Sequence, residues 1–304
     1  MDIFAGKSGR RWLAAACMLL SVSLGGEAMA AELQSIDQWE KQAANWLQQG
    51  KYEQALEVYS EAVAQYPANI HLLQKRGGVY LELGQPEQAQ RDFQKIVFMD
   101  GDNIEGYLGL AVRAACDGEM KQSRELFDRA LGLNEKNARL YMMRGRYYYE
   151  GIGDFEGAIR DYKQAKELAD EELKPELLRN ILVTYVNYAI YYPENMVKVI
   201  DTASELLSLP ELSVPHQREG YRLRMYAYEQ MGNYEAAFRD SQKLMELFQD
   251  DYMAQAWILN KQSAQLRKLD MPIEARKAML AALKRNPELT LPRYYENDPL
   301  FAEY

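Results

Sequence analysis

The sequence predicts an all-α protein, a solenoid of about six or seven antiparallel helix pairs. Three glycines that follow apolar-periodic segments, Gly50, Gly84 and Gly118, are spaced by 34 and 34 residues. The segment GKYEQALEVYSEAV at 50–63 recurs in similar form at 153–166 and 232–245. The chain holds only 10 Pro in 304 residues, which also favours helices. Recurrence at one fixed period is typical of a repeat array, in which each unit buries its apolar face against its neighbours.

The charge and the cysteine content argue against several classes of function. A formal net charge of −9 disfavours nucleic acid or an anionic membrane as the main partner, because both attract clustered Lys and Arg. Two Cys are too few for a disulfide-built scaffold, and two His leave little for a histidine metal site. Hydrophobic residues make up 48% of the chain, which is ample for a packed core.

The first thirty residues have the pattern of a secretory signal peptide. A basic start precedes an apolar run of about 14 residues at 12–25, which is shorter than the roughly 20 residues that span a bilayer as a helix. The small residues at 28–30 form the pattern that a signal peptidase reads, so we expect cleavage between Ala30 and Ala31. Residues 1–30 therefore predict export to the periplasm or the extracellular side of a bacterial envelope.

Two alternatives for this segment remain open: an uncleaved anchor, and a lipoprotein whose lipidated residue is Cys17. Most of the apolar run lies after Cys17, and Ala14 stands where a Leu is usual, so a cleaved signal is favoured. Membrane contact is expected only if the segment is uncleaved or lipidated. Cleavage would leave Cys116 as the single cysteine, and an internal disulfide would then be impossible.

The repeating residues have a physical reason for their spacing. A glycine that ends the first helix adopts the left-handed conformation without a Cβ penalty. Five residues after Gly50, the small side chain of Ala55 lets the second helix approach the first closely. Four residues further, Tyr59 lies on the same helix face and fills the space between neighbouring units.

These residues resemble the tetratricopeptide repeat (TPR) family, whose unit is a 34-residue helix pair. The resemblance covers residues 36–289 and is closest over 36–69. Eight residues of that first segment match the family pattern: Trp39, Trp46, Gly50, Tyr52, Ala55, Tyr59, Ala62 and Pro67. The resemblance implies a right-handed superhelical solenoid, and it implies a class of function without naming a partner.

The later repeats depart from the pattern in specific places. Residues 31–172 are expected to hold four repeats, and the fourth carries one extra residue before Gly153. Residues 173–217 predict a divergent helix pair, because two apolar-periodic segments meet at Pro193 without a glycine. A C-terminal pair of repeats follows at 218–289, with Asp270 in place of the turn glycine of the second. Residues 290–304 are expected to form a short capping tail.

No motif of catalysis or cofactor binding is found. The sequence has no GxxxxGK[ST] phosphate loop, no GxSxG and no HExxH. Gly151, Gly153 and Gly157 form only a loose GxGxxxG at a helix–helix turn, and His71 and His216 stand alone. We therefore expect no enzyme activity, no cofactor and no metal.

The resemblance also implies a binding surface. In the TPR family the first helix of each pair lines a concave groove that holds an extended peptide or a partner helix. The groove positions carried onto this chain are Gln74, Leu108, Val112, Arg139, Met142, Arg146, Tyr149, Arg222 and Tyr226. Arginine beside tyrosine and methionine suits a peptide with apolar anchors and one or two carboxylates. The alternative is that these arginines pair with acidic residues of adjacent repeats.

The expected function is therefore an exported, non-catalytic scaffold that binds a protein or peptide in its groove. Glu40 and Ala44 stand where chaperone-tail-binding members of the family carry Lys and Asn, which argues against that kind of carboxylate clamp. One alternative is a structural subunit of an envelope complex that self-associates through an end repeat or the divergent pair. A weaker alternative is a glycan or small-ligand binder that uses the tyrosines at 147–149 and 185–192.

Overall fold

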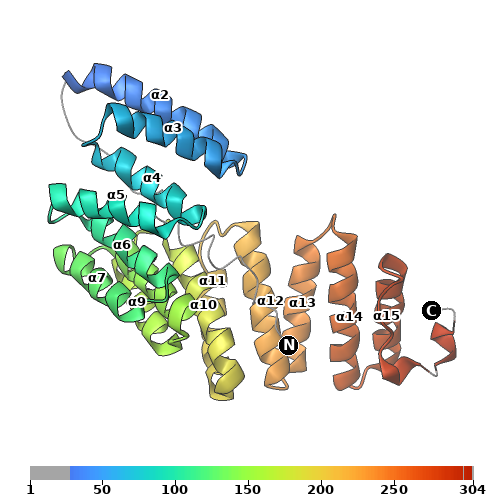
Figure 1. The fold of residues 1–304 in the computed structure, drawn as a ribbon. Helices are drawn as coiled ribbons and strands as arrows, with labels where there is room; N and C mark the ends of the chain where they lie inside the picture. Colours follow the sequence, from blue (N-terminus) through green and yellow to red (C-terminus); the bar gives the residue numbers. More distant parts are fainter. Residues whose placement is uncertain (1–27, 297, 303–304) are drawn as a thin grey trace. The chain divides into compact units, whose positions relative to one another are not determined.

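The structure is a computed structural model that describes residues 28–296 and 298–302, with side chains from residue 36 onward. This part of the chain contains fourteen α-helices and no strand (Figure 1). The all-α architecture of paired helices is thus confirmed. Residues 1–27 of the predicted signal peptide, which include Cys17, lie outside the residues that the structure describes. No described helix has the length and apolar character needed to cross a membrane.

The helices form two compact units, and unit 1 ends at Leu168. Its helices are α2 (Ala28–Gln48), α3 (Tyr52–Gln65), α4 (Ile70–Glu82), α5 (Pro86–Met99), α6 (Ile104–Cys116), α7 (Met120–Leu133), α8 (Ala138–Arg146), the π-helical segment η2 (Tyr147–Ile152) and α9 (Phe155–Leu168). Each helix packs mainly on the next one along the chain, as a solenoid of helix pairs requires.

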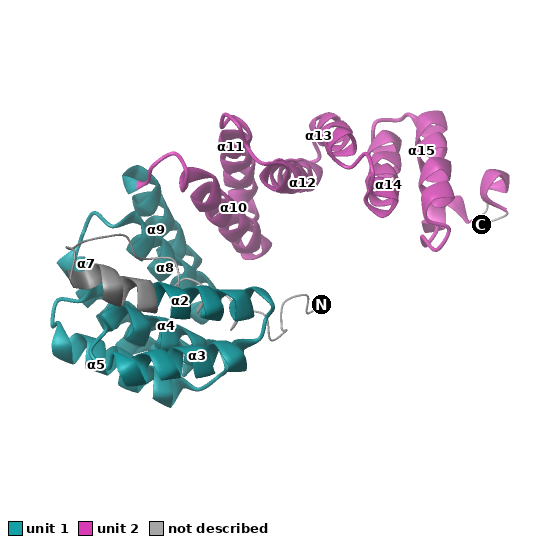
Figure 2. Ribbon diagram, turned by 90° about the horizontal axis from the view of Figure 1, so that it is seen from above, with its two compact units in different colours: residues 1–168 teal, residues 169–304 magenta. Residues whose placement is uncertain are grey.

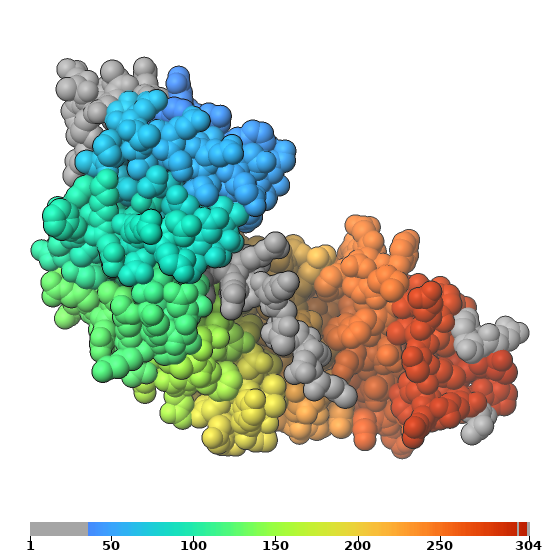
Figure 3. All heavy atoms as spheres, viewed as in Figure 1, coloured from blue at the N-terminus to red at the C-terminus, as the bar shows by residue number. Residues whose placement is uncertain are grey.

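Unit 2 begins at Ala169 and contains the remaining helices (Figure 2). They are α10 (Lys174–Tyr191), η3 (Pro193–Asn195), α11 (Met196–Leu207), α12 (Val214–Gln230), α13 (Tyr234–Leu247), α14 (Tyr252–Lys268), α15 (Pro272–Arg285), η4 (Arg293–Tyr295) and η5 (Pro299–Phe301). Within this unit α10, α12 and α14 lie on one side and α11 and α13 on the other (Figure 2). Side chains fill the space between neighbouring helices in the space-filling view (Figure 3). The division into parts at 172, 217 and 289 stays a prediction.

The turns between paired helices have the backbone that the glycine spacing predicts. Five glycines at these turns have φ between 67° and 78°: Gly50, Gly84, Gly118, Gly153 and Gly232. Asp270 adopts the same left-handed region with φ 58°, although its Cβ makes that conformation less favourable. Asn69, Asn103 and Asn137 add a marker at the same 34-residue period, because each side chain accepts a hydrogen bond from the backbone N–H three residues later.

Two further glycines allow close packing inside unit 1. Phe93 of α5 is fully buried between Gly77 of α4 and Gly109 of α6. A Cβ at Gly77 would lie 2.7 Å from the Phe93 ring, and one at Gly109 would lie 2.2 Å from it. These positions therefore require glycine because an aromatic ring occupies the space that a larger side chain needs.

The extra residue in the fourth repeat is absorbed by a π-helical turn. Helix α8 continues directly into η2, whose wider i→i+5 turn accommodates one more residue before Gly153. The segment is held in place by Tyr147, which is buried and donates a hydrogen bond of 2.6 Å to the Met120 carbonyl. The insertion thus leaves the following helix α9 in its normal place beside α8.

The fifth pair and the C-terminal tail are built without a turn glycine. Helix α10 ends at Tyr191, and Tyr192 with φ −134° leads into the 3-10 turn at Pro193. At the other end of unit 2, Tyr295 and Phe301 pack on Met279 and Leu283 of α15. The tail forms two 3-10 turns rather than a continuous helix, and it covers an apolar face that would otherwise meet water.

Candidate partner-binding surfaces

Three arginines form ion pairs between the two helices of a pair. Arg76, Arg144 and Arg224 occupy equivalent places on the first helices of the second, fourth and sixth pairs. Each forms two hydrogen bonds of 2.6–2.9 Å to an aspartate on the second helix of its own pair, namely Asp92, Asp161 or Asp240. The aspartates are buried and the arginines are largely so. These charges hold the pairs together and are not available to a partner.

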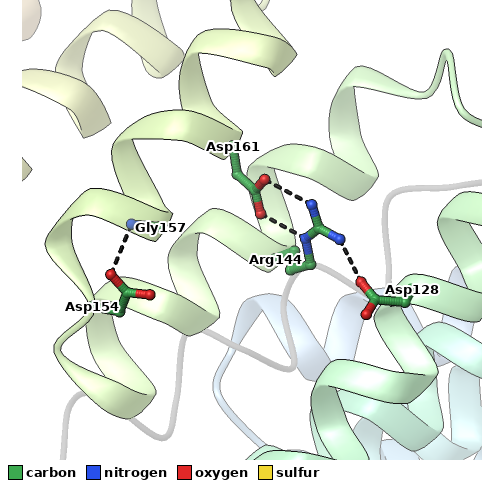
Figure 4. A network of polar contacts seen from close by, with 5 residues as sticks. All are labelled: Asp128, Arg144, Asp154, Gly157 and Asp161. Carbon is green, nitrogen blue, oxygen red and sulfur yellow. Dashed lines mark hydrogen bonds and ion pairs between the residues drawn. The ribbon is translucent and has the colours of Figure 1, made fainter.

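The Arg144 pair extends to the neighbouring repeat (Figure 4). Besides Asp161 of α9, Arg144 contacts Asp128 of α7 at 2.5 Å, so one guanidinium joins the third and fourth pairs. The hydrogen bond to Asp161 raises the pKa of Arg144, while burial acts in the opposite direction. The arginine therefore stays charged at every accessible pH, and Asp161 compensates its charge.

The structure places seven of the nine predicted groove residues in unit 1, and three of these are buried. Gln74, Leu108 and Val112 lie in the core with side chains at most 4% exposed. The remaining four lie on the helical segment 138–152. Arg139 is exposed, whereas Met142, Arg146 and Tyr149 are partly exposed. Contact of these residues with a partner stays a prediction.

Arg146 and Arg222 have acidic neighbours on their own helices rather than on adjacent repeats. Arg146 donates to Glu150 of the next turn at 3.0 Å. Arg222 lies 4.0 Å from Glu219 one turn earlier on α12, and 53% of its side chain is exposed. Such exposed pairs contribute little to stability. Both guanidiniums therefore keep surface that a partner could use.

Unit 2 adds residues that the sequence analysis did not assign to a site. Glu219 of α12 also accepts a hydrogen bond of 2.5 Å from Arg179 of α10, whose side chain is 44% exposed. Two arginines, one on α10 and one on α12, thus share one carboxylate of α12. The fifth pair has no turn glycine from which the positions of α10 could be counted. The sequence therefore did not align Arg179 with the groove positions of the other first helices.

Exposed apolar side chains lie on the adjoining helix α14. Met253 and Trp257 are four residues apart, so they share one face of this helix, and their exposed fractions are 61% and 39%. Their level relative to α12 follows from Glu229, which accepts hydrogen bonds from Lys261 and Gln265 of α14. The bonded residues are 32 and 36 positions apart in the sequence. By the same offsets, residues 254–258 of α14 lie opposite Arg222 of α12.

The two histidines and the described cysteine lie on three different helices, α4, α12 and α6. His71 contacts Glu40 of the first pair through its Nε2 atom. Cys116 is partly buried at the end of α6. Within residues 36–296 and 298–302, no three His, Cys, Asp or Glu side chains gather as metal ligands would.

Comparison with known families agrees with this architecture. Two models described as tetratricopeptide repeat match residues 47–114 and 117–172. Over these two segments the chain therefore resembles the tetratricopeptide repeat (TPR) family. The two matched segments run from the last residues of α2 to just beyond the end of α9. They therefore fall on the repeats of unit 1, which match the sequence pattern best.

Curated relatives resemble this protein over short stretches. The F-box/TPR repeat protein pof3 of Schizosaccharomyces pombe is 30% identical over 92 residues, which are 30% of this chain and 16% of pof3. Hsc70-interacting protein 1 of Drosophila melanogaster is 28% identical over 155 residues, 51% of this chain and 32% of that protein. The chain thus spans a third or less of the length of these relatives.

Two solved structures show the same fold. The C-terminal part of a TPR repeat-containing protein from Cytophaga hutchinsonii has a TM-score of 0.62 at 16% identity and covers 82% of this chain and 95% of that chain. PilW, described as a widely conserved type IV pilus biogenesis factor, has a TM-score of 0.53 at 17% identity, with coverages of 72% and 96%. At these identities the likeness concerns the fold alone.

Proposed function

We propose that this TPR protein is a non-catalytic adaptor that binds a partner protein or peptide on the exposed faces of its first helices. One observation carries the proposal: two sets of arginines on first helices differ in their partners and exposure. Arg76, Arg144 and Arg224 are held in buried pairs with aspartates, whereas Arg146 and Arg222 have exposed surface beside aromatic and methionine side chains on first helices. Exposed arginine next to such residues is typical of protein interfaces.

The proposal includes export to a bacterial envelope, and this part rests on the pattern of residues 1–30. A signal peptidase would release a mature chain that begins at Ala31. N-terminal sequencing and intact-mass measurement of the protein from its native source test this expectation. A chain that still begins at Met1 would contradict it, and a lipid-modified Cys17 would support the lipoprotein alternative.

Charge reversal on the first helices tests the adaptor role. The double variant Arg146→Glu/Arg222→Glu should lose its partner in crosslinked affinity capture from the native envelope fraction, because a like-charge contact then replaces an attractive one. A matched control is Arg160→Glu/Arg239→Glu, which changes the net charge equally at exposed positions of the second helices α9 and α13. Thermal unfolding of all variants checks that they remain folded.

The adaptor proposal fails if both double variants capture the same proteins as the wild type. If both lose capture equally, the effect comes from net charge rather than from the first-helix faces. The two single variants, Arg146→Glu and Arg222→Glu, then separate the contribution of unit 1 from that of unit 2.

Self-association through the end repeat is a second candidate, and the apolar surface near the C-terminus favours it. Ile273 and Met271 at the start of α15 are 60% and 41% exposed, and Leu300 of the tail is half exposed. Exposed apolar patches mark interaction sites when they are contiguous. Light scattering after size exclusion should show a dimer that Ile273→Asp dissociates, and a monomeric wild type would rule this candidate out.

A further inference from the structure

We infer that the C-terminal tail of one copy docks on α15 of a second copy, so that two chains exchange their tails and form a symmetric dimer. The inference rests on the second candidate above, self-association through the end repeat, and it names the segment that passes between the copies. In this structure the tail lies on α15 of its own chain. Three features favour exchange: the anchoring of the tail, the linker before it and the apolar side chains exposed around it.

The tail turns η4 and η5 are attached to α14 and α15 through side chains. Tyr295 and Phe301 pack on the apolar face of α15. The Tyr295 hydroxyl lies 3.0 Å from the hydroxyl of Ser263 on α14, and both are buried. Asp298 accepts a hydrogen bond of 2.6 Å from the Nε atom of Arg276 on α15. The contact between tail and helices therefore combines two buried aromatic rings with one ion pair.

The backbone of the described tail residues, 289–296 and 298–302, makes its hydrogen bonds within the segment 286–302. The tail is therefore a separate unit that side chains hold in place. The same side-chain contacts can form whether the tail comes from the same chain or from a second copy. Exchange of identical elements in this way is a low-cost route to dimers.

The linker at 286–292 has an extended backbone at both ends. Asn286 has φ −140° and ψ 93°, and Pro292 has φ −60° and ψ 140°. Both Pro287 and Pro292 disfavour helical backbone in the residue before them. A turn closed by the Leu289 N–H and the Asn286 carbonyl folds the linker back, and exchange requires this turn to open. The seven opened residues can span about 24 Å, more than the roughly 10 Å between packed helix axes.

Four apolar or aromatic side chains remain exposed while the tail lies on its own chain. Their exposed fractions are 60% for Ile273, 50% for Leu300, 44% for Tyr294 and 41% for Met271. We call these four residues the end surface. A second copy that approaches this end of unit 2 can cover them, and the dimer then gains apolar burial that the single chain lacks. Exchange therefore keeps the contacts of the tail and adds to them.

The contacts of the tail place the end surface around the turn between α14 and α15. The ring centre of Tyr294 lies 3.9 Å from Cζ of Arg267 at the end of α14. Asp298 pairs with Arg276, and Ile273 lies about one turn before Arg276 on α15. The ion pair is thus next to exposed apolar side chains. In a dimer with two-fold symmetry each copy supplies both halves of this contact, so one substitution changes it twice.

A charge swap at this ion pair tests where the tail binds. In the full chain, Arg276→Asp and Asp298→Arg each place like charges at the contact between α15 and the tail. When the two variants are mixed, exchange between unlike chains makes both contacts complementary. Native mass spectrometry with a mass tag on one variant should show a ratio of heterodimer to homodimers about tenfold above the statistical value.

Two controls separate this result from a general effect of charge. The double variant Arg276→Asp/Asp298→Arg restores the complementary contact and should dimerise as the wild type does. A mixture of Asp298→Arg with Arg239→Asp, at an exposed position of α13, carries the same charges as the test mixture and should give the statistical ratio. The preference in the test mixture should fall as salt rises, because the arginine of the pair is 48% exposed.

The inference and the proposed functions can fail separately. If Ile273→Asp dissociates a wild-type dimer but the charge-swap variants mix statistically, self-association stands and the exchange of tails is overturned. A preference of equal size in the Arg239→Asp mixture overturns it as well. A monomeric wild type overturns both self-association and the exchange of tails. The adaptor role is decided independently by the capture experiment with Arg146→Glu and Arg222→Glu.

Discussion

The fourth and fifth helix pairs reach the same arrangement by different means. The fourth pair turns at Gly153 with φ 70° and is joined by the buried Arg144–Asp161 ion pair. The fifth turns at Tyr192, whose φ is −134°, and Pro193, and its helices α10 and α11 bury apolar side chains such as Leu178 and Val199. Its ion pair, Arg179–Glu219, reaches α12 of the next pair and is partly exposed. Paired helices thus need a buried apolar face, whereas the glycine and the internal ion pair are features of particular repeats.

The largest expected difference between these pairs lies in their ion pairs. Asp161→Ala should lower the free energy of unfolding by about 3–5 kcal/mol, because it leaves Arg144 mostly buried without its bidentate partner. Arg179→Ala, in the exposed pair, should cost less than about 1 kcal/mol. Urea denaturation followed by circular dichroism measures both. Equal effects of the two variants would contradict the contrast between buried and exposed pairs, and Asp128→Ala is the control for the exposed arm of the Arg144 network.

The turn glycines should give the next largest effect. Gly84→Ala should destabilise the protein by about 1 kcal/mol, since φ 67° is unfavourable for a residue with a Cβ. The Cβ itself would meet no atom within 4 Å, so the cost is conformational rather than steric. Comparison with Gly132→Ala, where φ is not positive and a Cβ also has open space, isolates the backbone term. Alanine at Gly132 should be neutral or stabilising because it lies within α7.

A glycine introduced at a turn should help only where the backbone is left-handed. Asp270→Gly should stabilise the protein by up to about 1 kcal/mol, since Asp270 has φ 58°. Tyr192→Gly at the fifth-pair turn should give no such gain, because φ −134° suits any residue and glycine adds entropy to the unfolded chain. Melting temperatures of the two variants compare them directly. A larger rise in melting temperature for Tyr192→Gly than for Asp270→Gly would contradict this expectation.

An effect confined to alkaline pH concerns Tyr59, which lies nine residues after the turn glycine Gly50. Burial, with a lesser contribution from the charge of Glu40, raises the pKa of Tyr59 to about 12. An unfolded tyrosine has a pKa of about 10, so the folded state holds the proton more tightly. Its contribution to stability is present below pH about 10 and is lost as the pH rises toward about 12. Tyr59→Phe should therefore reduce the loss of stability between those pH values, as measured by urea denaturation at each pH. An unchanged pH profile would contradict the assignment.

The candidate surface was only partly predictable from residue positions. Arg222, Tyr226 and the exposed part of the segment 138–152 follow from carrying family positions onto the repeats. The same procedure selected Gln74, Leu108 and Val112, which are buried, because a helix position gives an angle around the axis but not the closeness of the next helix. This procedure did not select Arg179, because the fifth pair lacks the turn glycine that would align α10 with the other first helices.

The sequence by itself determined the helix pairs of this protein and the backbone of their turns. Glycine, small and aromatic residues recur at fixed offsets because local conformation and the contact between neighbouring helices depend on the same few residues. Only the tertiary structure decided which arginines are buried and which are exposed. Arg144 and Arg146 are two residues apart on one helical segment, yet Arg144 meets Asp161 of α9 while Arg146 donates to Glu150 on the next turn of its own segment. That difference arises because an aspartate 17 residues away comes within hydrogen-bonding distance only when the two helices pack.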